Sequence, residues 1–172
     1  APEAGKELAE IRKLFEEAVR QTRTLSFELS PPILYELGLD AALEWLGEEF
    51  QRRHGFEFEF NCEDKDSVPE AIGVLMFQAV RELLANVGKH AKAKHVKMAS
   101  RMDGAQLCIC VQDDGKGFDV KAATAAATEK ASLGLFSIRE RMRHIGGSFV
   151  VETKPGHGTT AVLHAPLKGE SS

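Results

Sequence analysis

Asp113-Asp114-Gly115-Lys116-Gly117-Phe118 joins a short apolar run to a long segment rich in alanine and threonine. The preceding run, Gln106-Leu107-Cys108-Ile109-Cys110-Val111, has the pattern of a strand that is buried on at least one face. The two glycines let the backbone approach another group closely, and a strand end that opens into a glycine loop is a common ligand site. Because Asp and Gly also dominate plain turns, this stretch alone fits a hairpin turn equally well.

The length and composition are ordinary for a soluble globular protein with room for one domain and an appendage. The chain has 172 residues, of which 43% are hydrophobic and 28% charged. The net charge of -4 argues against a general nucleic-acid binder. No apolar run is expected to reach the length of a membrane span and no signal peptide opens the sequence, so we expect no membrane contact by this chain.

The three cysteines are Cys62, Cys108 and Cys110. An odd number, with two alternating inside an apolar strand, indicates reduced core thiols in a cytosolic protein. A metal site at Cys108 and Cys110 is disfavoured because no further His or Cys pair lies at a usual ligand spacing.

The pattern of residues 5–30 predicts one long helix with a narrow apolar stripe along one side, called the seam. The seam follows a heptad repeat through Leu8, Ile11, Phe15, Ala18, Thr22, Leu25 and Leu29. Its length and narrowness favour a coiled-coil-like dimer bundle, and the alternative is a helix packed on its own domain. Ser30-Pro31-Pro32 is expected to stop this helix and begin a linker.

The rest of the chain alternates between helix and strand patterns. Helices are predicted at 38–53, 68–89 and 134–145, and strands at 56–60, 95–101, 105–112, 148–153 and 159–167. Residues 119–132 have few apolar anchors and are interpreted as a mobile lid. The fold class is therefore α/β, a two-layer sandwich with helices on one face of a mixed, largely antiparallel sheet.

Four separated motifs in this body resemble those of the GHKL ATPase superfamily, whose members share the Bergerat fold. Glu82-Leu83-Leu84-Ala85-Asn86-Val87-Gly88-Lys89-His90-Ala91 is similar to the N box. Asp113-x-Gly115-x-Gly117, Gly134-Leu135 with Ile138-Arg139-Glu140-Arg141, and Gly156-x-Gly158-Thr159 are similar to the three glycine-rich boxes. Each motif is weak singly, but their shared order over about 130 residues is specific.

Within the superfamily the chain resembles sensor histidine kinases that pair with LuxR-like response regulators. The linker from Leu29-Ser30-Pro31-Pro32 to Leu37-Gly38-Leu39 carries this likeness, as does the Lys89-His90 pair. The resemblance implies residues 1–30 as the second helix of the dimerisation and phosphoacceptor hairpin, 31–38 as a linker, and 39–172 as the ATP-binding catalytic domain. Two departures stand out: no histidine precedes His54, and Ser132 replaces the first glycine of the second glycine box.

The resemblance assigns the adenine side of the site to the first and last glycine boxes. Asp113 would accept a hydrogen bond from the exocyclic amine of adenine, which selects adenine over guanine. Gly115 and Gly117 would let the backbone pass near the base, and Thr159 and Thr160 would line the adenine side.

The phosphate side is assigned to the N box and the second glycine box. Asn86 would bind Mg²⁺ through its amide oxygen, and Lys89 and His90 would lie near the phosphates. Glu82 would orient a water or accept the proton of the phosphoacceptor, which makes Glu82 and Asn86 the catalytic candidates. The backbone amides of Gly134 and Leu135 would face phosphate at a helix start.

Plainer interpretations remain beside these roles. Glu82 is equally well explained by pairing with a cation, and His90 by a structural hydrogen bond. Lys116 is expected to point into the predicted lid, where it would reach phosphate. His54, His144, His157 and His164 fit ordinary surface or strand positions, and Arg139, Arg141 and Arg143 fit a solvated helix face.

The implied function is transfer of the γ-phosphoryl group of MgATP to a histidine on a helix outside this sequence. That phosphoryl group would pass to an aspartate of a response regulator, in a homodimeric, cytoplasmic or membrane-anchored parent. Two alternatives stay open: a non-catalytic nucleotide-binding or dimerisation module, and another GHKL enzyme such as an anti-sigma-factor serine kinase.

Overall fold

The computed structural model describes residues 10–16, 31–63, 68–119 and 130–167. The chain divides into two units, residues 1–32 and 33–172. In the first unit residues 10–16 are helical, as expected, and the side chains of Ile11 and Phe15 are exposed. Most of the predicted seam, and residues 120–129 of the predicted lid, lie outside the described residues.

The second unit is built on one five-stranded sheet. Its strands are β1 (Glu57–Cys62), β2 (His95–Asp103), β3 (Gln106–Asp113), β4 (Ser148–Thr153) and β5 (Thr159–Pro166). Their order is β1-β2-β3-β5-β4, with β1 and β2 parallel and the other neighbours antiparallel. The expected mixed, largely antiparallel sheet is confirmed.

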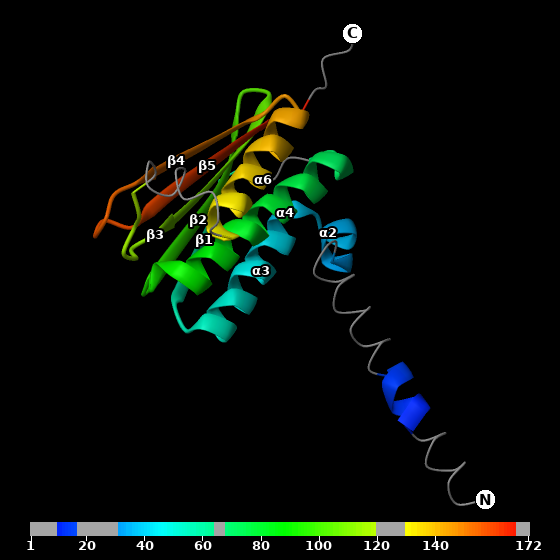
Figure 1. Ribbon diagram of the computed structural model, residues 1–172. Helices are drawn as coiled ribbons and strands as arrows, with labels where there is room; N and C mark the ends of the chain where they lie inside the picture. Colours follow the sequence, from blue (N-terminus) through cyan, green and yellow to red (C-terminus); the bar gives the residue numbers. More distant parts are fainter. Residues whose placement is uncertain (1–9, 17–30, 64–67, 120–129, 168–172) are drawn as a thin grey trace, which may run out of the picture. The chain divides into compact units, whose positions relative to one another are not determined.

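Three helices lie side by side on one face of this sheet (Figure 1). They are α3 (Leu39–His54), α4 (Glu70–Asn86) and α6 (Lys130–His144), and α4 continues into a π-helical turn, η1 (Val87–Ala91). The helix α4 contacts both α3 and α6, so it is the central helix of the layer. The two-layer sandwich predicted from the sequence is therefore present.

The core lies between the helix layer and the inner face of the sheet. Met76, Phe77 and Leu84 of α4 are fully buried, together with Leu43 of α3 and Ile138 of α6. Strand alternation places Leu107, Ile109 and Val111 of β3 on the same inner face. Burial of each large apolar side chain contributes about 1.5–3 kcal/mol, so these contacts fix the position of α4 on the sheet.

The apolar character of α4 corrects one expectation from the sequence. The continuous helical stretch Glu70–Ala91 has 22 residues and contains an 18-residue window with a mean hydropathy of 1.3, so it is long and apolar enough to cross a membrane by length and composition alone. Its buried side chains belong to the core between helices and sheet, and this packing accounts for the hydropathy.

The predicted linker 31–38 contains a short helix, α2 (Pro32–Glu36). Proline was interpreted as a helix stop, but it is also well tolerated at the first helical position, where its missing N–H costs nothing. Leu34 is buried in the core of the second unit. The boundary between units accordingly falls after Pro32, ahead of the predicted start of the catalytic domain at residue 39.

Two helix ends also differ from expectation. The helix expected at 134–145 begins at Lys130, so Gly134 is its fifth residue and not its start. The helix expected at 68–89 changes to π-helical hydrogen bonding after Asn86. The first difference places Gly134 inside the helix, and the second places Lys89 and His90 on the π-helical turn.

Candidate functional site

A cavity of about 200 Å³ opens between the end of α4, the turn η1, the loop after β3, the start of β5 and helix α6. Its walls are mostly apolar, with a few polar groups, which is the usual character of a small-molecule site. It brings together six of the residues predicted from the sequence: Asn86, His90, Asp113, Gly117, Leu135 and Thr159.

Asp113 is the buried carboxylate of this cavity. It is the last residue of β3, and only 6% of its surface is exposed. Its Oδ1 accepts a hydrogen bond from the backbone N–H of Gly115 at 2.8 Å. Burial raises the pKa of the Asp113 carboxyl, while hydrogen bonds from Gly115 and the Thr159 hydroxyl oppose that rise. A desolvated carboxylate in a cavity is a strong acceptor for a donor on a ligand.

The glycine loop after Asp113 is held on two sides. The N–H of Lys116 donates to the carbonyl of Ala91 at 2.8 Å, and the N–H of Gly156 donates to the carbonyl of Lys116 at 2.6 Å. Gly117 has φ of +58°, and a Cβ there would overlap the carbonyl oxygen of Lys154. Only glycine fits both the conformation and the space at position 117.

Asp114 ties the same loop to the start of β2. Its Oδ1 accepts hydrogen bonds from the N–H groups of Lys94 at 2.7 Å and His95 at 2.9 Å. Its Oδ2 lies 2.6 Å from Nδ1 of His95. These contacts, led by the hydrogen bonds of His95, lower the pKa of the Asp114 carboxyl to about 2.

Asn86 is the last residue of α4 and lines the cavity. Its side-chain nitrogen is buried and has no hydrogen-bond partner among the described residues. Such an orphan polar group is unusual, because nearly all buried polar groups are paired. This nitrogen has no accessible surface and lies toward Gly134 of α6, so a ligand in the cavity would reach it only after a movement of the amide or of α6.

Glu82 and Gly134 lie next to Asn86. A Cβ at Gly134 would overlap Oε1 of Glu82 and would come within 3.4 Å of Nδ2 of Asn86. The backbone of α6 thus passes directly over the two catalytic candidates. Because Gly134 is the fifth residue of the helix, its N–H lies within the intrahelical ladder and not among the free donors of the first turn.

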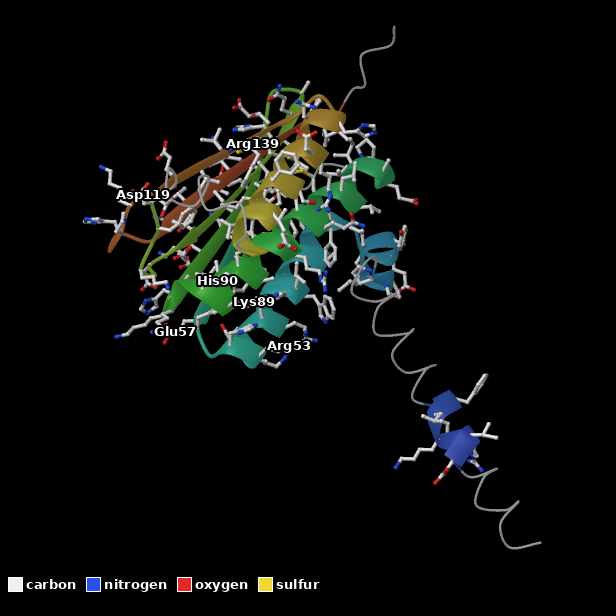
Figure 2. The ribbon with its side chains drawn as sticks, viewed as in Figure 1. Arg53, Glu57, Lys89, His90, Asp119 and Arg139 are labelled. Carbon is white, nitrogen blue, oxygen red and sulfur yellow. The ribbon has the colours of Figure 1, made fainter. Side chains whose placement is uncertain are left out.

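The turn η1 carries Lys89 and His90, both exposed, at the end of α4 (Figure 2). His90 lines the cavity, whereas Lys89 does not. A π-helical turn has more residues per turn than an α-helix, so Lys89 and His90 do not continue the face of Glu82 and Asn86 as α-helical spacing would predict.

His54 supports this turn from α3. Its ring is stacked on the rings of Phe50 and Phe56, with centroid distances of 5.6 Å and 6.4 Å respectively. A Cβ on Gly88 would lie 2.7 Å from three atoms of that ring. Gly88 therefore allows η1 to approach His54 closely.

Thr160 is separated from the cavity by strand alternation. Thr159 and Ala161 line the cavity, so the intervening Thr160 projects toward the other face of the sheet. Gly115 is buried beside Asp113 but does not line the cavity. The buried Gly134 and the half-buried Glu82, next to Asn86, do not line it either.

The sequence did not single out Asp114 or Thr153 as site residues. Thr153, the last residue of β4, accepts a hydrogen bond from the N–H of Phe118 at 3.1 Å and donates one to the carbonyl of Gly158 at 2.9 Å. The only available signal for Asp114 was its place beside Asp113, and no sequence signal indicated Thr153.

Comparison with known proteins agrees with the resemblance to the GHKL ATPases noted in the sequence. Residues 72–169 match the family model described as histidine kinase-, DNA gyrase B- and HSP90-like ATPase. The chain is 32% identical over 171 residues to the signal transduction histidine-protein kinase/phosphatase DegS of Brevibacillus brevis, covering 98% of this chain and 42% of DegS. It is 31% identical to a sensor-like histidine kinase of Chloroflexus aurantiacus, covering 94% of this chain and 28% of that protein.

Solved structures share the fold. The histidine kinase domain of the blue-light activated kinase of Erythrobacter litoralis EL346 has a TM-score of 0.63 at 24% identity, covering 75% of this chain and 61% of that one. The catalytic domain of histidine kinase ThkA has a TM-score of 0.60 at 20% identity, covering 77% of this chain and 93% of that one. The chain spans less than half the length of the two curated relatives. With the buried Asp113, the N-box helix and this fold in agreement, the chain belongs to the histidine kinase-, DNA gyrase B- and HSP90-like ATPase family and is homologous to the sensor histidine kinases.

Proposed function

We propose that this chain is the catalytic domain of a two-component sensor histidine kinase. It binds MgATP and transfers the γ-phosphoryl group to a histidine on a helix outside these 172 residues, for onward transfer to an aspartate of a response regulator. The observation that carries this proposal is a cavity with a buried carboxylate, Asp113, on one wall and on another the amide of Asn86, whose buried nitrogen has no partner among the described residues.

Asp113 supplies nucleotide selectivity. Its carboxylate accepts the exocyclic amine of adenine, whereas guanine presents a carbonyl oxygen at the equivalent position of its ring. Two acceptors facing each other in a buried site leave both unpaired, and this costs far more than the loss of an apolar contact. The apolar walls contributed by Val111, Val151 and Ala161 fit the faces and edges of a base.

Asn86 fits a role as ligand of Mg²⁺. The oxygen and nitrogen of an amide exchange places by a flip, and a turn of the Asn86 side chain toward the cavity would present its oxygen to a cation there. Mg²⁺ prefers few protein oxygens together with phosphate oxygens and water, and the described residues hold no group of three or more His, Cys, Asp or Glu that would form a separate site. When bound, Mg²⁺ offsets phosphate charge and orients the γ-phosphate.

Glu82, Lys89 and His90 complete the phosphate side. Glu82 lies one helical turn before Asn86 and accepts the proton of the attacking histidine or orients a water. His90 reaches the phosphates from the cavity wall, and the exposed Lys89 adds positive charge at its mouth. In phosphoryl transfer most of the rate comes from positioning and charge neutralisation, which these residues supply.

The whole protein is proposed to be a homodimer, joined through the helix at residues 5–30 once its hairpin is complete. We place the catalytic domain in the cytoplasm, where ATP and response regulators are found, with a parent protein that is soluble or membrane-anchored.

A labelling experiment tests the proposed activity. The chain is incubated with Mg²⁺ and γ-labelled ATP, alone and with a separate protein carrying the phosphoacceptor hairpin of a related kinase. We expect acid-labile label on the histidine of the added protein and none on this chain, and loss of labelling in Asn86→Ala. Stable label on this chain alone, or label on a serine of the added protein, would contradict the proposal.

A further inference from the structure

We infer that Thr153 is a positioning residue of the adenine site, an inference that rests on the proposed ATP-binding function. Thr153 ends β4, pairs with Thr159 of β5, and does not itself line the cavity. It acts through its hydroxyl, which holds the end of the glycine loop against the strand that carries Thr159.

Three polar groups converge on the Thr153 hydroxyl. The N–H of Phe118 donates to Oγ1 at 3.1 Å, Oγ1 donates to the carbonyl of Gly158 at 2.9 Å, and Oγ1 of Thr159 lies 3.2 Å away. Phe118 and Gly158 are 40 positions apart in the sequence and belong to different loops. A single hydroxyl therefore joins the two loops that enclose the adenine end of the cavity.

The hydroxyl protons of Thr153 and Thr159 are used in two other hydrogen bonds, which leaves their Oγ1 atoms in contact at 3.2 Å without a proton between them. The Thr159 hydroxyl donates to the Asp113 carboxyl. Thr153 uses its only proton on the carbonyl of Gly158, which leaves its lone pairs free for the N–H of Phe118. The position requires one donor and one acceptor on the same atom, which serine provides and valine does not.

The backbone around Thr153 leaves little freedom for a different arrangement of the two loops. A Cβ on Gly117 would lie 2.9 Å from the carbonyl oxygen of Gly158, and one on Gly158 would overlap the carbonyl oxygen of Asp113. The glycine loop and the loop between β4 and β5 are thus in direct contact, backbone to backbone. The Thr153 hydroxyl fixes how far Phe118 stands from Thr159, and both of these residues line the cavity.

Without the hydroxyl, the part-buried N–H of Phe118 and carbonyl of Gly158 lose their partner, and Phe118 is held less firmly near Thr159, while the backbone hydrogen bond from Gly156 to Lys116 still joins the two loops. The nucleotide would then have to restore their positions when it binds. Because this effect is confined to the adenine end, ATP and ADP should lose affinity by the same factor.

The test measures ATP and ADP affinity by calorimetry on the 172-residue chain and on four variants. Thr153→Val and Thr153→Ala remove the hydroxyl, Thr153→Ser retains it, and Ser148→Ala removes a hydroxyl from the far end of the same strand. We expect about tenfold weaker binding of both nucleotides in the Val and Ala variants, as for the loss of one or two hydrogen bonds. The Ser variant should stay within about twofold of wild type, and Ser148→Ala should match it.

Amide hydrogen exchange separates positioning from general stability. In the Val variant the Phe118 amide should exchange faster, while amides of the β2–β3 ladder keep their rates. Wild-type affinity in Thr153→Val, or an equal loss in Thr153→Ser, would overturn this inference while leaving ATP binding intact. Absence of ATP binding by the wild-type chain would instead overturn the proposed function and this role together.

Discussion

Asp113 and Thr159 face each other as paired residues at the end of the β3–β5 ladder, and the Thr159 hydroxyl donates to the Asp113 carboxyl. The strand register therefore delivers the buried acceptor and its supporting donor to the same wall of the cavity. An antiparallel pair of strands fixes this spacing without help from a ligand. The adenine end of the site is in this sense preorganised by the sheet.

Replacing Asp113 with asparagine should stabilise the fold and weaken ATP binding. The pKa of Asp113 is raised mainly by burial, so the folded state binds a proton more tightly than the unfolded chain does. Its ionised form then opposes folding at neutral pH, and stability rises as pH falls through the raised pKa. Urea unfolding at pH 7 should show a higher midpoint for Asp113→Asn, with a flatter pH dependence. A lower midpoint would show that the ionised carboxylate supports the fold.

Replacing Asn86 with leucine should raise the stability of the fold and remove the effect of Mg²⁺ on ATP binding. The buried Asn86 nitrogen has no partner among the described residues, and an unsatisfied buried polar group costs about 1–3 kcal/mol. Asn86→Leu is close in volume and should therefore raise the unfolding free energy by about 1 kcal/mol, while Mg²⁺ no longer enhances ATP affinity. Calorimetry with and without Mg²⁺ gives the second quantity. A variant with a lower free energy of unfolding, whose ATP affinity Mg²⁺ still enhances, would contradict both expectations.

Gly88→Ala should destabilise the turn η1 by forcing a methyl group against the His54 ring. The new Cβ would lie 2.7 Å from ring atoms, closer than carbon atoms approach in proteins, and such overpacking costs about 1–3 kcal/mol. Because the ring is the obstacle, His54→Ala in the same chain should recover most of this loss. A double-mutant cycle on unfolding free energies measures the coupling. Additive effects would mean that the ring does not restrict position 88.

Acid should release the loop that Asp114 holds. Its pKa is lowered to about 2 in the folded protein, below the unfolded value of about 3.9. The lowered pKa means that Asp114 contributes stability above about pH 4, and that this contribution is lost as pH falls toward 2. Carboxyl carbon shifts by NMR should place the Asp114 midpoint near 2, and the amide shifts of Lys94 and His95 should follow the same curve. A midpoint near 4 would show that the contacts with these two amides are absent in solution.

Much of the fold could be predicted because its signals are local. The apolar face of α4 and the alternation of β3 follow directly from side-chain periodicity, and Gly55 ends α3 in the left-handed conformation, as expected for a glycine after a helix. The proline at 32 was ambiguous, since the same residue stops one helix and starts another.

Only the site residues that belong to a recognisable motif could be predicted from the sequence. The spacing of Glu82, Asn86 and Lys89 fits an α-helix, and nothing in that spacing reveals the π-helical turn at Val87–Ala91. Thr160 differs from Thr159 only by strand register, which sequence alone does not give. The role of Thr153 depends on Phe118 and Gly158 meeting in space, a non-local contact without a sequence signature.

The most direct test of the central claim is calorimetric titration of this chain with ATP and with GTP in the presence of Mg²⁺, repeated on Asp113→Ala. The account predicts saturable one-site binding of ATP, GTP binding weaker by at least about a hundredfold, and loss of ATP binding in the variant. Equal affinities for ATP and GTP, or ATP binding that survives Asp113→Ala, would show that this cavity does not read adenine through Asp113.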